Sequence, residues 1–388
     1  MRNNINSLLF VAALIMVVSV NAFAEGSDAH PADGLAKMNL DHMAEDGTFH
    51  IPAFELPMSR GLSNESKTAA IKMARAFPEF ASILAKDCPI SLGEAKPQEL
   101  AEIRECRANA FKKTFWHKDA KARFPAKMIS QDIGGVRTDI YTPLKGVAPK
   151  NEHRILIHLH GGGMQYGAYW QGQISAAPIA VEGGYKVISV DYRQWPEANH
   201  PAAMEDVLAV YRELLKDYRA ENVGIYGCSA GGYFSGQSIA WIDSKGLPLP
   251  GAVGMFGGAI SSASDSGFLG TAVEGNPVLV KNHVVKDSID VGYLAGSRLS
   301  DKLVLPGDHP DVLAKYPPSL LITSTRDGGM SSTVATHSNL IKAGVDADLH
   351  VWEGLGHCFT EYPFVPEAGD ARRVTLKFFD KHLGVVPL

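Results

Sequence analysis

The sequence predicts an α/β fold in which a mainly parallel central sheet is covered by helices on both faces. Beyond residue 153, short apolar runs alternate with segments whose apolar residues recur at three- and four-residue spacing, as strands and helices do when they alternate along a chain. The runs are apolar almost throughout, which is typical of strands buried on both faces of a parallel sheet. With 388 residues, of which 45% are hydrophobic and 20% charged, the chain can bury a large core.

The N-terminus has the pattern of a cleavable secretory signal. Arg2 supplies a short basic region, residues 8–20 are apolar, and a small-x-small cleavage site ends at Ala24. We therefore expect residues 1–24 to be removed and the mature protein, periplasmic or secreted, to start at Glu25. A retained membrane anchor is the alternative, but the apolar stretch is shorter than the roughly 20 residues that a spanning helix needs, so we expect no stable anchor after cleavage.

Residues 25–128 are expected to form a polar lead-in followed by a helical region of two or three helices. From Asn64 onward, the segments "NESKTAAIKMARAFPEFASILAK" and "KPQELAEIRECRANAFKKTFW" carry apolar residues at helical spacing, and Pro97 stands near the start of the second segment. Cys88 and Cys106 both lie in this region. In the oxidising compartment that an export signal implies, they can form a disulfide, and the sequence is compatible with either state.

Residues 129–388 are assigned to one α/β domain. A hairpin leads into it, "AKMISQDIGGVRTDIYTP", whose two alternating runs flank Gly134 and Gly135. Residues 262–317 form an irregular insert with weak periodicity, and such inserts often line or cover a site. The later strands are expected in "RILIHLHGGG", "YKVISVDYR", "NVGIYGCSAGG", "GAVGMFGGA", "SLLITSTRDG" and "ADLHVWEGLGH", and helices in "PAAMEDVLAVYRELLKDY", "SSTVATHSNLIKAG" and "RRVTLKFFDKHL".

Two candidate nucleophiles, Cys228 and Ser229, stand side by side in "YGCSAGGY", which reads as a strand, a sharp turn and a helix. Ligands of a parallel α/β sheet bind outside the carboxyl ends of its strands, so this turn is a place for chemistry. A side chain held on so tight a turn needs neighbours without bulk two positions before and after it. Ser229 has Gly227 and Gly231 there, whereas the cysteine has a tyrosine and an alanine. The spacing therefore selects Ser229.

A serine hydroxyl needs an adjacent base, usually a histidine that a carboxylate orients. His357 in "EGLGHCF" lies in a short loop after a late strand, and Asp327 directly follows the strand "SLLITSTR". The resulting chain order of Ser, Asp and His is one that α/β enzymes use, so we assign Asp327 as the acid and His357 as the base. Other histidines are set aside as the base because they lie in a helix (His337, His382), within a strand (His350) or ahead of the acid (His283, His309). Other aspartates are set aside as the acid because they lie in the irregular insert: Asp301, Asp308 and Asp311.

Attack on a carbonyl group places negative charge on its oxygen, and backbone N–H groups must be aimed at that oxygen to stabilise it. The loop "HGGG" can supply the N–H groups of Gly162 and Gly163, and Ala230 after the nucleophile supplies a third. We expect His160 and Gly161 to support this loop, His160 through hydrogen bonds. A phosphate-binding loop is the alternative use of the glycines, but no Gly-Lys-Ser/Thr ending follows them.

The motifs "HGGG", "DYRQWPEANHPAAMED" and "GCSAGG", followed by Asp327 and "GLGHCF", resemble the hormone-sensitive-lipase-like branch of the α/β-hydrolases, a family of carboxylesterases and lipases. The resemblance runs from about residue 129 to the C-terminus. It implies the α/β-hydrolase fold with a helical cap over the site, for which the helices upstream of Lys127 are the candidate. Carried over motif by motif, it implies the same triad and the same oxyanion donors.

Two positions depart from the family pattern. Cys228 stands where the family usually has Asp, and Gln194 with Trp195 stand where it usually has Leu-Ala. Both positions lie near the pocket, so the family's substrate preferences are not carried over. For Cys228 and Cys358 we expect buried free thiols. On that basis Cys228→Ala keeps most of the activity, whereas Ser229→Cys loses nearly all of it.

Large side chains follow the oxyanion loop and a later strand end. Met164, Tyr166, Tyr169 and Trp170 come directly after the glycines, and Trp195 follows the strand "YKVISV". They can form an acyl or alcohol pocket, or they can pack against the cap, and the sequence favours neither use.

Charge and motif content exclude several other classes of protein. With a net charge of -5 and no block of Lys or Arg, we expect neither nucleic acid nor an anionic membrane as a partner. The sequence has no H-E-x-x-H motif, Cys-His ligand set or dinucleotide fingerprint in its required context, so we expect no metal and no organic cofactor.

The sequence thus predicts an exported serine hydrolase that cleaves small-molecule carboxylic esters, with short to medium acyl chains favoured, through an acyl-enzyme. Three alternatives share the fold. An amidase or peptidase and an interfacial lipase would use the same triad, and a binding protein would use none. The sequence carries no signal for the oligomeric state.

Overall fold

The computed structural model describes residues 55–90, 96–262 and 292–384, and those from Met58 onward belong to one compact unit. The signal sequence, the mature start at Glu25, His283 and most of the insert lie outside the described residues.

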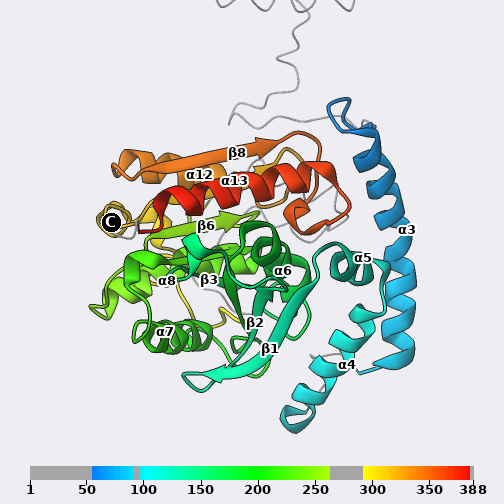
Figure 1. Cartoon of the computed structure of the whole chain (residues 1–388), viewed down its shortest axis with the longest axis horizontal. Coiled ribbons are helices and arrows are strands. Elements are labelled where there is room, and N and C mark those ends of the chain that lie inside the picture. The colour runs from blue at the N-terminus through cyan, green and yellow to red at the C-terminus, as the bar shows by residue number, and fades with distance from the viewer. Residues whose placement is uncertain (1–54, 91–95, 263–291, 385–388) are drawn as a thin grey trace, which may run out of the picture. The chain divides into compact units, whose positions relative to one another are not determined.

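An eight-stranded sheet forms the centre of the unit, in the order β1-β2-β4-β3-β5-β6-β7-β8 (Figure 1). β2 pairs antiparallel with β1 and with β4, and every later pair of neighbours is parallel. The predicted fold class is confirmed, and each predicted run holds a strand. The strands are β1 (Ala126–Ile133), β2 (Val136–Pro143), β3 (Ile155–Leu159), β4 (Lys186–Val190), β5 (Val223–Cys228), β6 (Ala252–Phe256), β7 (Ser319–Ser324) and β8 (Ala347–Trp352).

The predicted hairpin joins β1 to β2 through a two-residue turn. Gly134 and Gly135 have φ angles of 62° and 83°, the left-handed region at both positions. This backbone suits the twist of a tight hairpin and favours glycine, because other residues adopt it at a cost. A Cβ on Gly134 would lie 2.7 Å from the carbonyl oxygen of Ala209, so the turn also packs closely against the helix that contains Ala209.

Helices cover both faces of the sheet, as predicted. Alternate side chains of β3 enter opposite cores: Ile155, Ile157 and Leu159 pack on one side, and Leu156 packs on the other. Burial on both faces explains why four of the five residues of the strand are apolar, with His158 the exception. The first core is closed by α7 (Ala202–Leu214), α8 (Ala230–Ser244) and α12 (Met330–Lys342), and the second by α6 (Gly172–Gly183) and α13 (Pro366–His382).

Within residues 55–90 and 96–125, three helices precede β1, in line with the two or three expected: α3 (Asn64–Asp87), α4 (Leu100–Lys112) and α5 (Phe115–Arg123). They lie together at one side of the sheet (Figure 1). A disulfide between Cys88 and Cys106 joins the end of α3 to α4. At the other end of α3, the N-cap residue Ser63 donates its backbone N–H to Glu367 of α13 over 2.9 Å. The disulfide therefore joins two helices of this region to each other, and the Ser63–Glu367 bond joins the region to a helix that covers the sheet.

The other regular elements of the described segments are short: η3 (Pro97–Glu99), η4 (Pro149–Asn151), η5 (Ala220–Asn222), η6 (Pro306–Asp308), α11 (Pro310–Leu313) and η7 (Phe359–Glu361). Of these, η6 and α11 lie in the described part of the insert. Among the helices described, none combines the length and the apolar character that crossing a membrane requires.

Candidate active site

Ser229 occupies the turn between β5 and α8, directly before the first residue of the helix. Its φ is 60° and its ψ is -125°, a conformation that a residue with a side chain rarely adopts. The surrounding structure holds it there: its backbone N–H donates to the carbonyl oxygen of Phe256 over 2.8 Å. The turn leaves the serine side chain half-buried at the carboxyl end of the strand.

Two glycines make this turn sterically feasible. A Cβ on Gly227 would lie 2.2 Å from the carbonyl oxygen of Leu159, and a Cβ on Gly231 would lie 1.9 Å from the same oxygen. Any side chain at either position would push β3 away from the turn. The spacing argument that separates Ser229 from its cysteine neighbour therefore has a direct steric cause, the contact with the end of β3.

Asp327 and His357 meet at the ends of β7 and β8. His357 Nδ1 lies 2.7 Å from Asp327 Oδ1, and the exposed fractions of the two side chains are 33% and 1%. The buried carboxylate also accepts the Gly329 N–H over 2.7 Å and the Thr323 hydroxyl over 3.0 Å. A carboxylate only accepts hydrogen bonds, so Nδ1 carries the proton and Nε2 is the basic nitrogen of the neutral ring.

The dipeptide after β6 brings these groups to one place. A Cβ on Gly257 would lie 3.0 Å from Asp327 Oδ2 and 3.3 Å from His357 Nδ1, and a Cβ on Gly258 would lie 2.4 Å from the carbonyl oxygen of Ser229. The two glycines thus fill the space between the nucleophile turn and the Asp–His pair. Gly258 has no space for a side chain, and the φ of 56° at Gly257 favours glycine. The "FGGA" sequence after β6 is the sequence signal for both residues.

The glycine loop after β3 lies against the nucleophile. A Cβ on Gly161 would lie 3.2 Å from Ser229 Cβ, so the loop backbone packs directly on the serine. Gly162 and Gly163 have φ angles of 102° and 61°, and the Cβ position of Gly163 has no neighbour within 4 Å among the described residues. Ala230 is the first residue of α8. The three expected oxyanion donors therefore belong to the two segments that flank Ser229.

His160 supports this loop through a hydrogen bond and a ring contact. Its Nδ1 lies 2.8 Å from the carbonyl oxygen of Gly161, and its ring stacks on Tyr192 with centroids 4.2 Å apart. Burial lowers the pKa of His160 to about 4, so the imidazole is neutral at neutral pH. Because a carbonyl oxygen only accepts, Nδ1 donates this bond. The Tyr192 hydroxyl in turn donates to the backbone carbonyl of His160.

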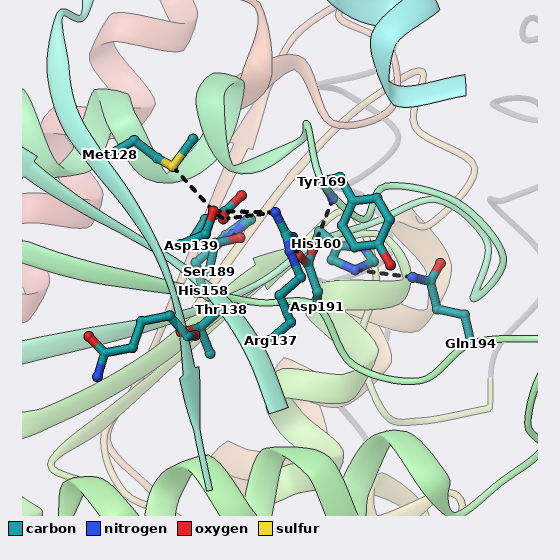
Figure 2. A network of polar contacts seen from close by, with 12 residues as sticks. Met128, Arg137, Thr138, Asp139, His158, His160, Tyr169, Ser189, Asp191 and Gln194 are labelled. Atoms are coloured by element: carbon teal, nitrogen blue, oxygen red, sulfur yellow. Dashed lines mark hydrogen bonds and ion pairs between the residues drawn. The ribbon is translucent and has the colours of Figure 1, made fainter. Parts of the chain in front are cut away.

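A second polar network holds the continuation of the loop (Figure 2). Asp191, directly after β4, accepts the backbone N–H of Tyr169 over 3.0 Å and forms an ion pair with Arg137 of β2. The Arg137 guanidinium lies 4.3 Å from the centroid of the Tyr169 ring. The "DYR" segment that follows β4 therefore anchors the loop beyond the glycines through Asp191 and supports His160 through Tyr192, two roles that sequence reasoning missed.

Arg104 of α4 reaches the same loop from the helical region. Its guanidinium donates to the carbonyl oxygens of Gln165 and Trp195 and pairs with Glu197. The side chain is buried, with 6% exposed. A buried guanidinium needs several acceptors, and here they come from the segments that follow β3 and β4. No sequence motif identified Arg104, because its partners lie 61 to 93 residues away along the chain.

The expectation of free thiols at Cys228 and Cys358 is wrong. The two cysteines form a disulfide with an S–S distance of 2.03 Å, although they are 130 residues apart. The bond joins the residue before Ser229 to the residue after His357. The expectation that Cys228→Ala keeps most of the activity rests on a free thiol and loses its basis.

The disulfide also accounts for the cluster of potential metal ligands that the described residues contain. Cys228 Sγ, Cys358 Sγ and a carboxylate oxygen of Glu361 lie within 4.8 Å of one another. Thiolates bind metals, whereas sulfurs joined in a disulfide have no thiolate to offer. The buried carboxylate has other partners, since Gln171 Nε2 donates to it over 2.8 Å and Ser175 donates its hydroxyl.

Some of the large side chains that follow the glycine loop are buried by packing, and others are partly exposed. Trp170 packs on Phe111 of α4, with ring centroids 3.6 Å apart, in a cluster that ties α4 and α5 to α6. Tyr166 is 40% exposed beneath Arg107 of α4. For Trp170 the packing role therefore holds. Of the three remaining residues, Tyr169 lies against the Arg137 guanidinium, and Met164 and Trp195 pack partly buried against the larger core.

Comparison with known proteins is consistent with this arrangement. Residues 156–361 match the family described as alpha/beta hydrolase fold. An acetyl-hydrolase of Streptomyces hygroscopicus is 27% identical over 236 residues, which cover 59% of this chain and 76% of that protein. An acetyl esterase of Salmonella schwarzengrund is 23% identical over 281 residues, which cover 68% of this chain and 82% of the relative.

Solved structures show the same architecture. The crystal structure of an esterase called E25 superposes with a TM-score of 0.69 at 27% identity, covering 87% of this chain and 99% of that one. An esterase from the bacterial hormone-sensitive lipase family superposes with a TM-score of 0.60 at 22% identity, covering 79% of this chain and 98% of the other. At that identity the second likeness concerns the fold alone.

Proposed function

The chain belongs to the α/β-hydrolase family and is a carboxylesterase-type hydrolase, and from this premise we propose that it cleaves small-molecule carboxylic esters through an acyl-enzyme formed on Ser229. One observation carries the proposal: a strained turn presents a serine at the end of β5, and the adjacent glycines Gly257 and Gly258 pack against this turn and against a buried carboxylate that is hydrogen-bonded to a histidine. This combination supplies a nucleophile, a base and an orienting acid, which is what acyl transfer by a serine requires.

In the proposed first step, His357 Nε2 accepts the proton of Ser229 Oγ as the hydroxyl attacks the ester carbonyl. Asp327 keeps Nδ1 protonated and stabilises the imidazolium that forms. Backbone N–H groups of the glycine loop and of Ala230 stabilise the negative oxygen, and each such donor contributes about 3 to 4 kcal/mol to lowering the barrier. The imidazolium then protonates the departing alcohol. A water molecule, deprotonated by the same histidine, hydrolyses the acyl-enzyme and releases the acid.

We propose short to medium acyl chains as the preferred substrates. The relatives named acetyl-hydrolase and acetyl esterase support a small acyl group. On p-nitrophenyl acetate, butyrate, octanoate and palmitate we expect kcat/KM to be highest among the shorter esters and at least about 10-fold lower for palmitate, because a pocket that fits a short chain excludes a long one. Initial rates below the solubility limit of each ester measure this.

Two results with further substrates or conditions would contradict the proposal. A rate that jumps once palmitate or tributyrin exceeds its solubility limit would identify an interfacial lipase. Hydrolysis of p-nitroacetanilide at a rate comparable with p-nitrophenyl acetate would identify an amidase, because amides resist attack far more than activated esters do.

We also propose that the protein is exported and processed. The basic, apolar and small-residue regions that end at Ala24 support a cleavable signal. The two disulfides, Cys88–Cys106 and Cys228–Cys358, support an oxidising compartment, since such bonds are rare in the reducing cytosol.

In a Gram-negative host, we expect the full chain to yield a periplasmic or secreted protein whose first residue is Glu25. N-terminal sequencing and intact mass of the fractionated protein measure this. Ala24→Arg is the control variant, because a large charged residue before the cleavage site should block processing. A cytosolic product that still carries residues 1–24 would contradict export.

A further inference from the structure

We propose that the Cys228–Cys358 disulfide is a positioning cross-link that holds the His357 loop in line with Ser229, so that breaking it lowers turnover in a protein that stays folded. The proposal rests on the function proposed above. It goes beyond that function because it assigns a role to two residues that take no part in proton transfer.

The position of the bond in the sheet is the first argument. Ser229 follows β5 and His357 follows β8, and β6 and β7 lie between these strands. The nucleophile and the base therefore come from strands that do not touch. The disulfide spans this gap, since Cys228 is the last residue of β5 and Cys358 follows the histidine.

Hydrogen bonds tie the segment that precedes His357 to the strand that carries the acid. Ser324 donates its hydroxyl to the carbonyl oxygen of Leu355 over 2.6 Å, and Thr325 accepts the N–H of Gly354 over 2.7 Å. Both belong to the end of β7, the strand that carries the acid. These bonds align the base with the acid. The disulfide adds a covalent link from the residue after His357 to β5, the strand that ends at the nucleophile.

The sulfur lies close to the reacting pair. The point where a Cβ of Gly257 would stand is 3.2 Å from Cys228 Sγ, 3.0 Å from Asp327 Oδ2 and 3.3 Å from His357 Nδ1. The disulfide and the Asp–His pair thus pack around the same glycine. Catalysis is sensitive to small displacements here, because a shift of about 1 Å between reacting groups can cost on the order of 100-fold in rate.

The surroundings favour the oxidised state. Cys228 is 3% exposed, and the carboxylate of Glu361 lies within 4.8 Å of both sulfurs. Reduction by a dithiol transfers two electrons and two protons to the disulfide, and the dithiol closes to its own cyclic disulfide. Each step must expel a thiolate, and a buried site disfavours that anion. The bond is therefore suited to a permanent structural role.

The test compares two double variants, Cys228→Ser/Cys358→Ser and Cys88→Ser/Cys106→Ser, each of which removes one disulfide. For the first we expect kcat on p-nitrophenyl butyrate to fall about 10- to 100-fold with KM changed by less than about threefold, because the substrate pocket is intact while the base is misaligned. For the second, whose disulfide lies in the helical region, we expect kcat to stay near the wild-type value. Cys228→Ala/Cys358→Ala repeats the first variant without a buried hydroxyl.

Two further readouts separate positioning from a general loss of stability. In wild-type protein treated with dithiothreitol, kcat should fall as the Cys228–Cys358 bond is reduced and should return on reoxidation with oxidised glutathione. Mass spectrometry of alkylated peptides measures how much of the bond is reduced. The apparent pKa of the base in the pH profile of kcat/KM should also move when the bond is broken, because a displaced His357 ring changes its exposure to solvent. Circular dichroism at the assay temperature reports whether each form is folded.

Folded Cys228/Cys358 variants with wild-type kcat and pH profile would overturn the inference. Global unfolding of both variants and of the reduced protein would overturn it too, because the bond would then act on the fold rather than on His357. Failure of the proposed function looks different: the oxidised wild-type protein would not hydrolyse the ester, or Ser229→Ala would hydrolyse it equally well.

Discussion

Ser229→Ala is expected to lower kcat on p-nitrophenyl butyrate by on the order of 10⁶-fold, the loss seen when a serine nucleophile is removed from a complete triad. The Asp327–His357 pair and the glycine loop stay in place, so the small residual rate should come from the oxyanion donors and from substrate binding. Stopped-flow or long-time absorbance assays on freshly purified protein measure the difference.

The matched control is Ser244→Ala, in the last turn of the same helix. Its hydroxyl donates to the carbonyl oxygen of Trp241 over 2.8 Å, far along α8 from the turn, and its loss should leave kcat unchanged. A fluorophosphonate probe should label the wild type and the control at Ser229 and should not label Ser229→Ala. Substantial esterase activity in Ser229→Ala would contradict the assignment and point to another nucleophile.

Asp327→Asn is expected to lower kcat by on the order of 10⁴-fold while the protein stays folded. An asparagine can keep the local bonds: its Oδ1 can accept from His357 and from the Gly329 N–H, and its amide can donate to the Thr323 hydroxyl. What it removes is the negative charge that stabilises the imidazolium in the transition state. KM should change little, because the aspartate is buried behind the histidine, with 1% of its side chain exposed.

Asp311→Asn is the control for this prediction. Asp311 is exposed in the first turn of α11 and belongs to the aspartates of the insert that were set aside as candidate acids. Its substitution should leave kcat within about twofold of the wild type, the scatter expected of a surface site. If Asp327→Asn lost less than about tenfold, or if Asp311→Asn lost as much, the assignment of the acid would be wrong.

The sheet and the nucleophile turn were predictable because both depend on short stretches of sequence. β3 and β5 are buried at every position and, apart from His158, contain no charged or strongly polar side chain, and this shows in five or six consecutive residues. The turn at Ser229 requires Gly227 and Gly231 because the carbonyl oxygen of Leu159 leaves no space for a Cβ. A local steric requirement of this kind leaves a local sequence pattern.

The placement of Asp327 and His357 was predictable for a different reason. Parallel strands put their carboxyl ends at one edge of the sheet, so residues that follow different strands can meet there whatever their separation in the chain. The 2.7 Å contact between the two side chains agrees with that expectation. What the sequence could not specify was how the loops that carry them are held.

The contacts that hold those loops depend on pairs of residues far apart in sequence. Arg104 in α4 bonds to Gln165, beyond the glycine loop, and Trp116 in α5 donates its indole N–H to the carbonyl oxygen of Glu361 over 2.9 Å. Neither residue stands in a motif, because an arginine or tryptophan in a helix is compatible with many environments. Which acceptor it meets follows only from how the helical region packs on the sheet.

The sequence alone determined the α/β class, the strand order along the chain and the three residues at the strand ends, because periodicity, glycine spacing and the geometry of parallel sheets are all expressed locally. Only the tertiary structure decided the state of the cysteines. Cys228 and Cys358 lie 130 residues apart, and a disulfide requires their Cα atoms to come within a narrow range, here 5.9 Å, which no spacing in the chain can indicate. The residue beside the nucleophile is thus one half of a covalent link to the residue beside the base.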